Sequence, residues 1–188
     1  MPTAGYAYQL ALQSYTKRKV RGKVVETAQS AMFTFHLIDE SNARTILSWR
    51  YKPPYNLYNY LEDEANLLQH ILHPQNTFYS IMDENSELVA YCSFGQDGQV
   101  TGGNYHNQAL DIGMGIRPDL TGQRKGAEYA NAVLEFADSL FKPKAFRVTI
   151  AAFNKRAIRV WQKLGFEHQQ SFERGSDGMQ FIVLLRSD

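Results

Sequence analysis

The pattern of hydrophobic and polar residues predicts a strand and a helix in the middle of the chain. Over residues 110–116, apolar residues alternate with Asp111 and two glycines, which is the period of a strand with one buried face. Pro118 then ends the strand pattern. Apolar residues resume at helical spacings of three and four, at Ala127, Ala130, Leu134, Ala137 and Phe141. The stretch therefore predicts a strand, a glycine-containing loop and an amphipathic helix.

Residues 146–166 repeat the order of strand and helix. A short apolar strand is predicted over residues 148–152. Asn154 is a favourable N-cap for the helix that follows, and Gly165 is suited to end it. The apolar stripe of this helix consists of Ala157, Ile158, Trp161 and Leu164.

The rest of the chain predicts further strands and two more helices. Strands are predicted at residues 33–38, 77–82, 88–95, 167–173 and 179–185. Helices are predicted from an N-cap within residues 39–41 to about residue 49, and over residues 63–72. The last two strands are joined by a turn and form a closing hairpin. This order predicts a mixed α/β (α+β) fold with a largely antiparallel sheet.

The loop before the central helix has the features of a phosphate site. A helix begins with unbonded N–H groups and a partial positive charge, and Gly122 and Gly126 let a phosphate approach this backbone closely. Arg124 and Lys125 add full charges. The alternative is a plain turn with a solvated basic pair.

Two stretches, LDIGMGIRPDLTGQRKGA and FNKRAIRVWQKLGF, resemble the two central motifs of the GNAT superfamily of N-acetyltransferases. The resemblance runs from about Phe33 to Arg186. It implies a sheet of six to seven strands flanked by about four helices, with a splay between the fourth and fifth strands that holds the cofactor. Gly113 and Gly115 lie where the splay would begin, and strand glycines mark a bulge or a close approach by another backbone or a ligand.

The resemblance implies acetyl-coenzyme A (acetyl-CoA) as the phosphate-bearing co-substrate, and it implies no metal. The backbone of one loop would hold the pyrophosphate, at Gly122, Gln123, Arg124, Lys125, Gly126 and Ala127. The end of the preceding strand would pair with the pantetheine arm and polarise the thioester, at Met114, Gly115, Ile116 and Arg117. Asn154 would contact the pantetheine arm, and Trp161 would line the thioester pocket.

The chain departs from the family pattern at three positions. Thr121 and Arg124 replace the first two fixed residues of the pyrophosphate loop, and only Gly126 matches the third. Trp161 stands where many members carry a tyrosine that protonates the leaving thiolate. Indole cannot donate a proton at a useful pKa, so this role is vacant or belongs to another residue.

Acetyl transfer needs a group that takes the proton of the acceptor amine. Asp111 on the central strand is a candidate base, and its alternative is a paired or solvated polar residue. His106 and Glu173 are weaker candidates. The segment 50–61 holds four tyrosines and two prolines, which either enclose an amine or pack over the edge of the domain.

Composition sets the class of protein. The chain has 188 residues, a net charge of +1 and one cysteine, Cys92, which we expect in the core. These values predict a single globular domain, a reducing cytoplasmic location and no disulfide framework. They also make a membrane partner or a nucleic-acid partner unlikely for the whole chain. His70 and His73 have the spacing of metal ligands, but no third ligand lies near them in the sequence.

Charge divides the chain into a basic extension, residues 1–31, and a GNAT-like domain, residues 32–188. Residues 1–31 hold five basic residues and one acidic residue, a net charge of +4 that leaves −3 for the remainder. The extension is an upstream segment, a transit peptide, or an arm for nucleic acid or a partner.

The favoured function is an N-acetyltransferase that moves the acetyl group from acetyl-CoA to a primary amine of a small molecule or peptide, by direct attack in a ternary complex. The resemblance also implies a possible homodimer. Two alternatives stay open at this point. One is a CoA-binding or interaction module of the same fold with reduced catalysis, and the other is a binding protein that works through the basic extension.

Overall fold

The computed structural model of the chain describes residues 32–60 and 63–187. The interpretations of residues 1–31 given above lie outside these described residues. Within them, no helix is long and apolar enough to cross a membrane.

A mixed sheet forms the centre of the molecule. Its strands, in spatial order, are β1 (Thr34–Leu37), β2 (Phe78–Met82), β3 (Leu88–Phe94), β4 (Leu110–Ile116), β5 (Ala145–Ala151), β7 (Met179–Ser187) and β6 (Glu167–Arg174). Every neighbouring pair is antiparallel except β4 and β5, which are parallel. The prediction of a largely antiparallel sheet is therefore confirmed.

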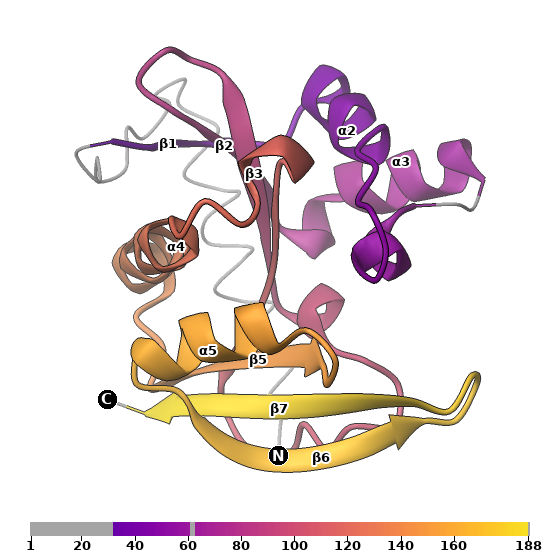
Figure 1. Cartoon of the computed structure of the whole chain (residues 1–188). Coiled ribbons are helices and arrows are strands. Elements are labelled where there is room, and N and C mark those ends of the chain that lie inside the picture. Colours follow the sequence, from indigo (N-terminus) through magenta and orange to yellow (C-terminus); the bar gives the residue numbers. More distant parts are fainter. Residues whose placement is uncertain (1–31, 61–62, 188) are drawn as a thin grey trace.

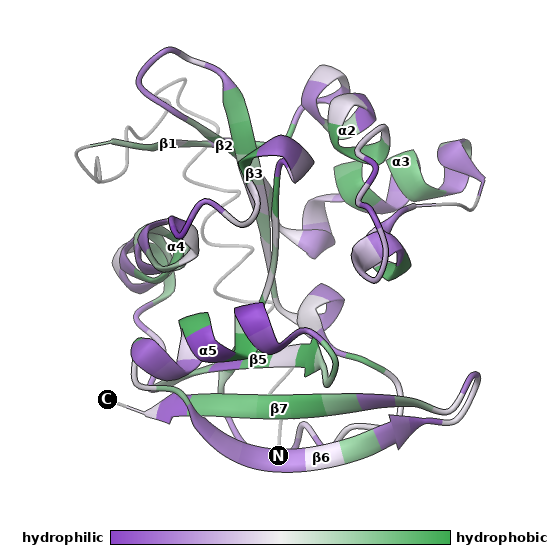
Figure 2. Cartoon of the chain, viewed as in Figure 1, coloured by the Kyte–Doolittle hydropathy of each residue, from purple (hydrophilic) through white to green (hydrophobic). Residues whose placement is uncertain are grey.

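Helices cover both faces of the sheet (Figure 1). They are α2 (Glu40–Leu47), α3 (Glu64–Leu72), α4 (Gly126–Phe141) and α5 (Lys155–Lys163). Side chains of α2 and α3 pack with Phe78 and Leu88 in one core, whereas α4 and α5 contribute to a second, larger core. In Figure 2 the strands β3 and β7 are hydrophobic and the segment before α4 is hydrophilic. The helices are thus held by their apolar faces, and the loop before α4 is left to solvent.

Local sequence signals explain where the helices begin. Asp39 accepts a hydrogen bond from the backbone N–H of Asn42 at 2.8 Å, which caps α2. Asn154 accepts from the N–H of Ala157 at 3.1 Å and caps α5, as its position in the sequence predicts. The helix α2 ends at Leu47, slightly before the expected end near residue 49.

Strands β4 and β5 pair over a short length only. Their register contains Leu110 with Phe146 and Asp111 with Arg147. Beyond these pairs, the residues of β4 from Ile112 to Ile116 are registered with β3. This is the point of the sheet at which the family resemblance implies a splay.

Candidate functional site

The outer half of β4 offers a backbone edge toward β5. Arg117 N–H donates to Val89 O at 2.8 Å and Gly95 N–H donates to Asp111 O at 2.9 Å, so the odd-numbered residues of β4 direct their backbone groups toward β3. Because alternate residues of a strand point their N–H and C=O groups to opposite sides, Met114 and Ile116 direct theirs toward β5. No strand pairing is recorded there among the described residues. This edge can accept an extended ligand as an added strand.

The N-terminus of α4 lies downstream of the same strand. Glu128 and Tyr129 donate to Lys125 O at the start of the helix, and no side chain caps it. In the part of the chain that the structure describes, the N–H groups of Gly126 and Ala127 have no recorded acceptor. Such a helix start attracts anions through these N–H groups and the helix dipole.

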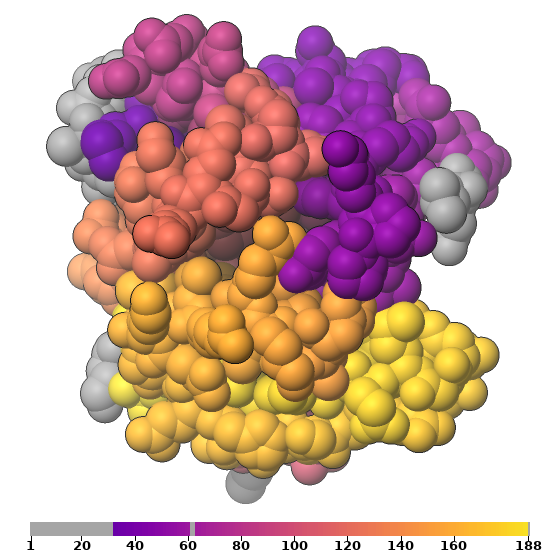
Figure 3. Space-filling model, viewed as in Figure 1, coloured from indigo at the N-terminus to yellow at the C-terminus, as the bar shows by residue number. Residues whose placement is uncertain are grey.

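Three cations surround this helix start. Arg124 and Lys125 are exposed, and Arg124 has a left-handed φ of 65°. Gly122 has a φ of 79°, and a Cβ added to it would lie 3.2 Å from a terminal nitrogen of Arg156 on α5. Arg156 also lies over the ring of Tyr55, 4.0 Å from its centroid. Figure 3 shows a hollow between the segment before α4 and the start of α5.

The other polar residues of the loop between β4 and α4 make hydrogen bonds and ion pairs within the protein. Thr121, at the first departure from the family pattern, donates its hydroxyl to Pro118 O at 2.8 Å. The side chain of Gln123 donates to Asp119 O at 3.0 Å. The guanidinium of Arg117 contacts Asp119 and Glu87, so its side chain is directed to the β2–β3 turn.

The aromatic segment, residues 51–60, contacts both β4 and the start of α5. The hydroxyl of Tyr51 donates to Ile116 O at 2.9 Å. The hydroxyl of Tyr58 accepts a hydrogen bond from the Asn154 amide at 3.1 Å. Burial raises the pKa of both phenols. The segment therefore connects the end of β4 with the residue before α5, across the part of the sheet where β4 and β5 do not pair. These two phenols keep their protons.

Side chains of β3 and the following turn fill the space above the two glycines of β4. A Cβ at Gly113 would lie 2.3 Å from Ser93 Oγ and 3.3 Å from Asp97 Oδ2. A Cβ at Gly115 would lie 2.4 Å from the ring of Tyr91, whose hydroxyl is 3.0 Å from that of Tyr60. The sequence predicts a bulge or an approach by another backbone or a ligand at these glycines, whereas the neighbours in the structure are side chains of β3 and the turn after it.

A hydrogen-bonded chain of three side chains crosses this face. Ser93 Oγ donates to Asp97 Oδ2 at 2.5 Å, and His70 Nε2 lies 2.8 Å from Asp97 Oδ1. Asp97 belongs to the short 3₁₀ helix η4 (Gln96–Gly98), and His70 lies on α3. Within the described residues, no group of three potential metal ligands occurs.

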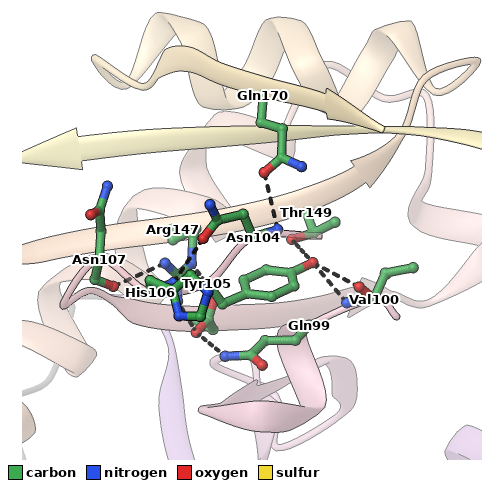
Figure 4. Close-up of polar contacts among 10 residues, drawn as sticks. Gln99, Val100, Asn104, Tyr105, His106, Asn107, Arg147, Thr149 and Gln170 are labelled. Carbon is green, nitrogen blue, oxygen red and sulfur yellow. Dashed lines mark hydrogen bonds and ion pairs between the residues drawn. The ribbon is translucent and has the colours of Figure 1, made fainter. Parts of the chain in front are cut away.

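Asp111, the predicted base, forms an ion pair with Arg147 between β4 and β5. Arg147 donates to Asp111 Oδ1 at 2.6 Å and to Asp111 Oδ2 at 2.7 Å, and both side chains are 4% exposed. Gln99 donates to the second oxygen at 2.8 Å. Figure 4 shows Arg147 among Gln99, Tyr105 and the other residues of the 99–107 segment. This is the paired arrangement that the sequence left as the alternative for Asp111.

The remaining predicted site residues have other surroundings. Trp161 is buried, with its ring 5.0 Å from that of Phe166. His106 lines a polar pocket of about 160 Å³ between the segment 104–107 and β6–β7, and none of the residues predicted to bind acetyl-CoA lines it. Glu173 accepts from Gln180 at 2.9 Å on the β6–β7 hairpin.

Sequence reasoning missed Arg156 and Asp97 as site residues, and it considered His70 only as a metal ligand. Their positions depend on contacts between distant segments, such as His70 with Asp97, which are 27 residues apart. The only local signal was the polar turn after a buried strand, where functional side chains often lie.

Comparisons with known proteins agree with this arrangement. A model of the Acetyltransferase (GNAT) family matches residues 41–166. No curated protein sequence matches the chain.

Several solved structures share the fold. A chimera of the spermidine N-acetyltransferase SpeG from Vibrio cholerae and hSSAT is 14% identical with a TM-score of 0.66, over 82% of this chain and 95% of that chain. An acetyltransferase (GNAT family) from Bacillus anthracis is 13% identical with a TM-score of 0.65, over 83% and 95%. Mutant forms of the spermidine/spermine N-acetyltransferase SpeG from Vibrio cholerae are 14% identical with a TM-score of 0.63, over 84% and 95%.

Proposed function

Because the chain belongs to the acetyltransferase (GNAT) family, we propose that it transfers the acetyl group of acetyl-CoA to a primary amine of a small molecule or peptide. Attack takes place directly, with both substrates bound together. Spermidine-like polyamines are the first acceptors to test, since several of the similar structures are spermidine N-acetyltransferases.

One observation carries this proposal: an open strand edge leads to an uncapped helix start. The N–H and C=O of Met114 and the N–H of Ile116 can pair with the amides of a pantetheine arm, whereas the C=O of Ile116 already accepts from Tyr51. The N–H groups of Gly126 and Ala127 are available for a pyrophosphate. Arg156 adds a cation beside the same loop.

The chain supplies three chemical functions to this reaction. Because both reactants are held in one cleft, the bimolecular reaction becomes an effectively unimolecular step. A backbone N–H of the open edge stabilises the negative charge that develops on the thioester oxygen. We assign protonation of the leaving thiolate to Tyr58, because its hydroxyl accepts from Asn154 and no acceptor for its own proton is recorded among the described residues.

Calorimetric titration of acetyl-CoA tests the binding site. Gly126→Glu places a negative charge and added bulk at the helix start, so we expect it to abolish binding that the wild type shows. Gly175→Glu makes the same change where an added Cβ meets nothing within 4 Å, and we expect it to bind as the wild type does. A wild type that does not bind acetyl-CoA would refute the proposal.

Release of free thiol in the presence of amines tests the reaction. We expect the wild type to release CoA thiol with spermidine or with a lysine-containing peptide. Binding of acetyl-CoA without release of thiol with any amine would favour the alternative, a CoA-binding module of the same fold. This alternative is motivated by the departures from the family pattern at Thr121, Arg124 and Trp161, the last of which leaves the usual tyrosine position without a hydroxyl.

A further inference from the structure

We infer that Asp97, held in place by Ser93 and His70, binds the ammonium group of the acceptor and accepts its proton. This inference rests on the proposed function. Asp97 is a catalytic residue in this assignment, and Ser93 and His70 are positioning residues.

The hydrogen bonds around Asp97 fix its carboxylate. The side-chain amide nitrogen of Asn76 lies 3.2 Å from His70 Nδ1 and can only donate to it. This places the ring proton on Nε2, from which it is donated to Asp97 Oδ1 at 2.8 Å. Ser93 donates to the other oxygen at 2.5 Å. Each oxygen receives one hydrogen bond and keeps a lone pair for a ligand.

The position of Asp97 suits an acceptor that attacks from the α2–α3 face. Its Oδ2 lies 3.3 Å from the point where a Cβ on Gly113 would be. The next residue, Met114, belongs to the open edge of β4. An amine beside Asp97 is therefore close to the strand edge at which the thioester would be held.

The surroundings of Asp97 favour a cation. Tyr91 and Asp97 lie on the same face of β4, because a Cβ at Gly115 would meet the Tyr91 ring and a Cβ at Gly113 would meet Asp97 Oδ2. The hydroxyl of Tyr91 lies 3.0 Å from that of Tyr60. Burial raises the pKa of both, so they stay neutral and add no competing negative charge. Neutral phenol rings and one carboxylate together form a site for a primary ammonium group.

The two carboxylates of this region differ in availability. Both carboxylate oxygens of Asp111 accept hydrogen bonds from Arg147, and the Asp111 side chain is 4% exposed. Asp97 is 20% exposed, and its partner His70 is 50% exposed. Of these two carboxylates, Asp97 is the one that can both receive a proton from the acceptor and release it to solvent.

The proton balance of the step is complete. The ammonium loses one proton to Asp97, which exposes the nitrogen lone pair. The C–N bond forms with the acetyl carbon and the C–S bond breaks. The nitrogen loses a second proton and the sulfur gains one, so one proton is released to solvent in total.

Steady-state transfer to spermidine by the full-length chain tests the role of Asp97. Asp97→Asn removes the basic site and keeps the shape, so we expect kcat/KM to fall by about 10²- to 10³-fold. We expect the titration of spermidine into CoA-saturated protein to weaken, while acetyl-CoA affinity and melting temperature stay unchanged. Asp138→Asn makes the same change on the exposed face of α4 and should act like the wild type.

The role of His70 is tested by rescue. His70→Ala leaves Asp97 without one of its donors, and we expect a loss of about tenfold in kcat/KM. His70→Gln restores a side-chain N–H, and we expect most of this loss to be recovered. If His70 contributed to folding alone, His70→Ala would lower the melting temperature, and His70→Gln would not restore kcat/KM.

These experiments distinguish a failure of the assignment of Asp97 from a failure of the proposed function. Equal transfer and equal spermidine titration by the wild type and Asp97→Asn would overturn the assignment of Asp97 and leave the proposed function intact. A wild type that neither binds acetyl-CoA nor releases thiol would overturn the proposed function, and the assignment of Asp97 with it.

Discussion

The side chains that pack against position 113 leave space for a glycine there and for no larger residue. The missing side chain of Gly113 leaves space for Ser93 Oγ, which lies 2.3 Å from an added Cβ. No ligand is required to explain a glycine at this position. The residue nonetheless bears on function, because Ser93 in turn orients Asp97.

Gly113→Ala should lower both stability and transfer. The added methyl group displaces Ser93, and overpacking of this kind costs about 1–3 kcal/mol. Urea unfolding monitored by fluorescence measures the change in unfolding free energy. Gly175→Ala is the matched control, since nothing lies within 4 Å of its added Cβ and no change is expected. Equal stability of both variants would contradict the packing found at Gly113.

The thiol of Cys92 should be unreactive in the folded protein. It is fully buried, and burial raises its pKa well above the usual value. We expect no reaction with a disulfide reagent at pH 8 and one equivalent of reaction in denaturant.

The raised pKa of the Cys92 thiol also predicts how stability depends on pH. The unfolded thiol ionises near pH 8.5 and the folded thiol does so only at higher pH, so the unfolding free energy falls as pH rises above about 8.5. Cys92→Ala should reduce this slope between pH 8 and pH 10. An unchanged slope would mean that other titrating groups cause the fall in unfolding free energy.

At the scale of elements, α4 and α5 meet beside the proposed phosphate site. A Cβ on Gly126 would lie 3.1 Å from Val160, so the glycine lets the two helices approach closely. The same contact places Arg156 of α5 next to the loop before α4. The arrangement gives the anion site a cation that the local sequence of the loop does not contain.

Arg156→Ala should weaken acetyl-CoA binding by about tenfold, because it removes a charged donor beside the pyrophosphate position. Calorimetric titration of acetyl-CoA measures this change. Arg159→Ala removes an equal charge from the same helix at an exposed residue for which no contact with the loop is recorded among the described residues, and it should bind as the wild type does. Equal weakening of both variants would indicate a general effect of charge and no local contact.

At the scale of the molecule, the two halves of the sheet meet at β4 and β5. Their backbone register contains two residue pairs, and the buried ion pair of Asp111 and Arg147 joins the same point. Loss of one partner of a buried pair leaves an unpaired charge and costs about 3–5 kcal/mol.

Asp111→Asn should therefore lower the unfolding free energy by about 3 kcal/mol. Asp177→Asn breaks a partly exposed pair with Arg174 and should cost less than about 1 kcal/mol. Urea unfolding of the two variants gives the comparison. Complete loss of transfer with unchanged stability in Asp111→Asn would instead identify Asp111 as the base.

The sequence by itself determined the order of the elements, and it predicted an anion site at the start of α4. Alternation over residues 110–116, the helical stripe that follows and the N-cap Asn154 depend on local patterns of hydrophobicity and capping, which a single chain displays. The GNAT fold is implied by the resemblance of two stretches to the family's motifs, and it is confirmed.

Only the tertiary structure decided which side chains share a surface. Asp111 and Asp97 are both aspartates at a strand or just after one, and their sequence surroundings do not distinguish a buried ion pair from a partly exposed carboxylate. The difference arises because Arg147 reaches Asp111 across 36 residues, whereas Asp97 meets His70 from another helix. Charge pairing and exposure are properties of the packed fold, and they assign the two carboxylates to different tasks.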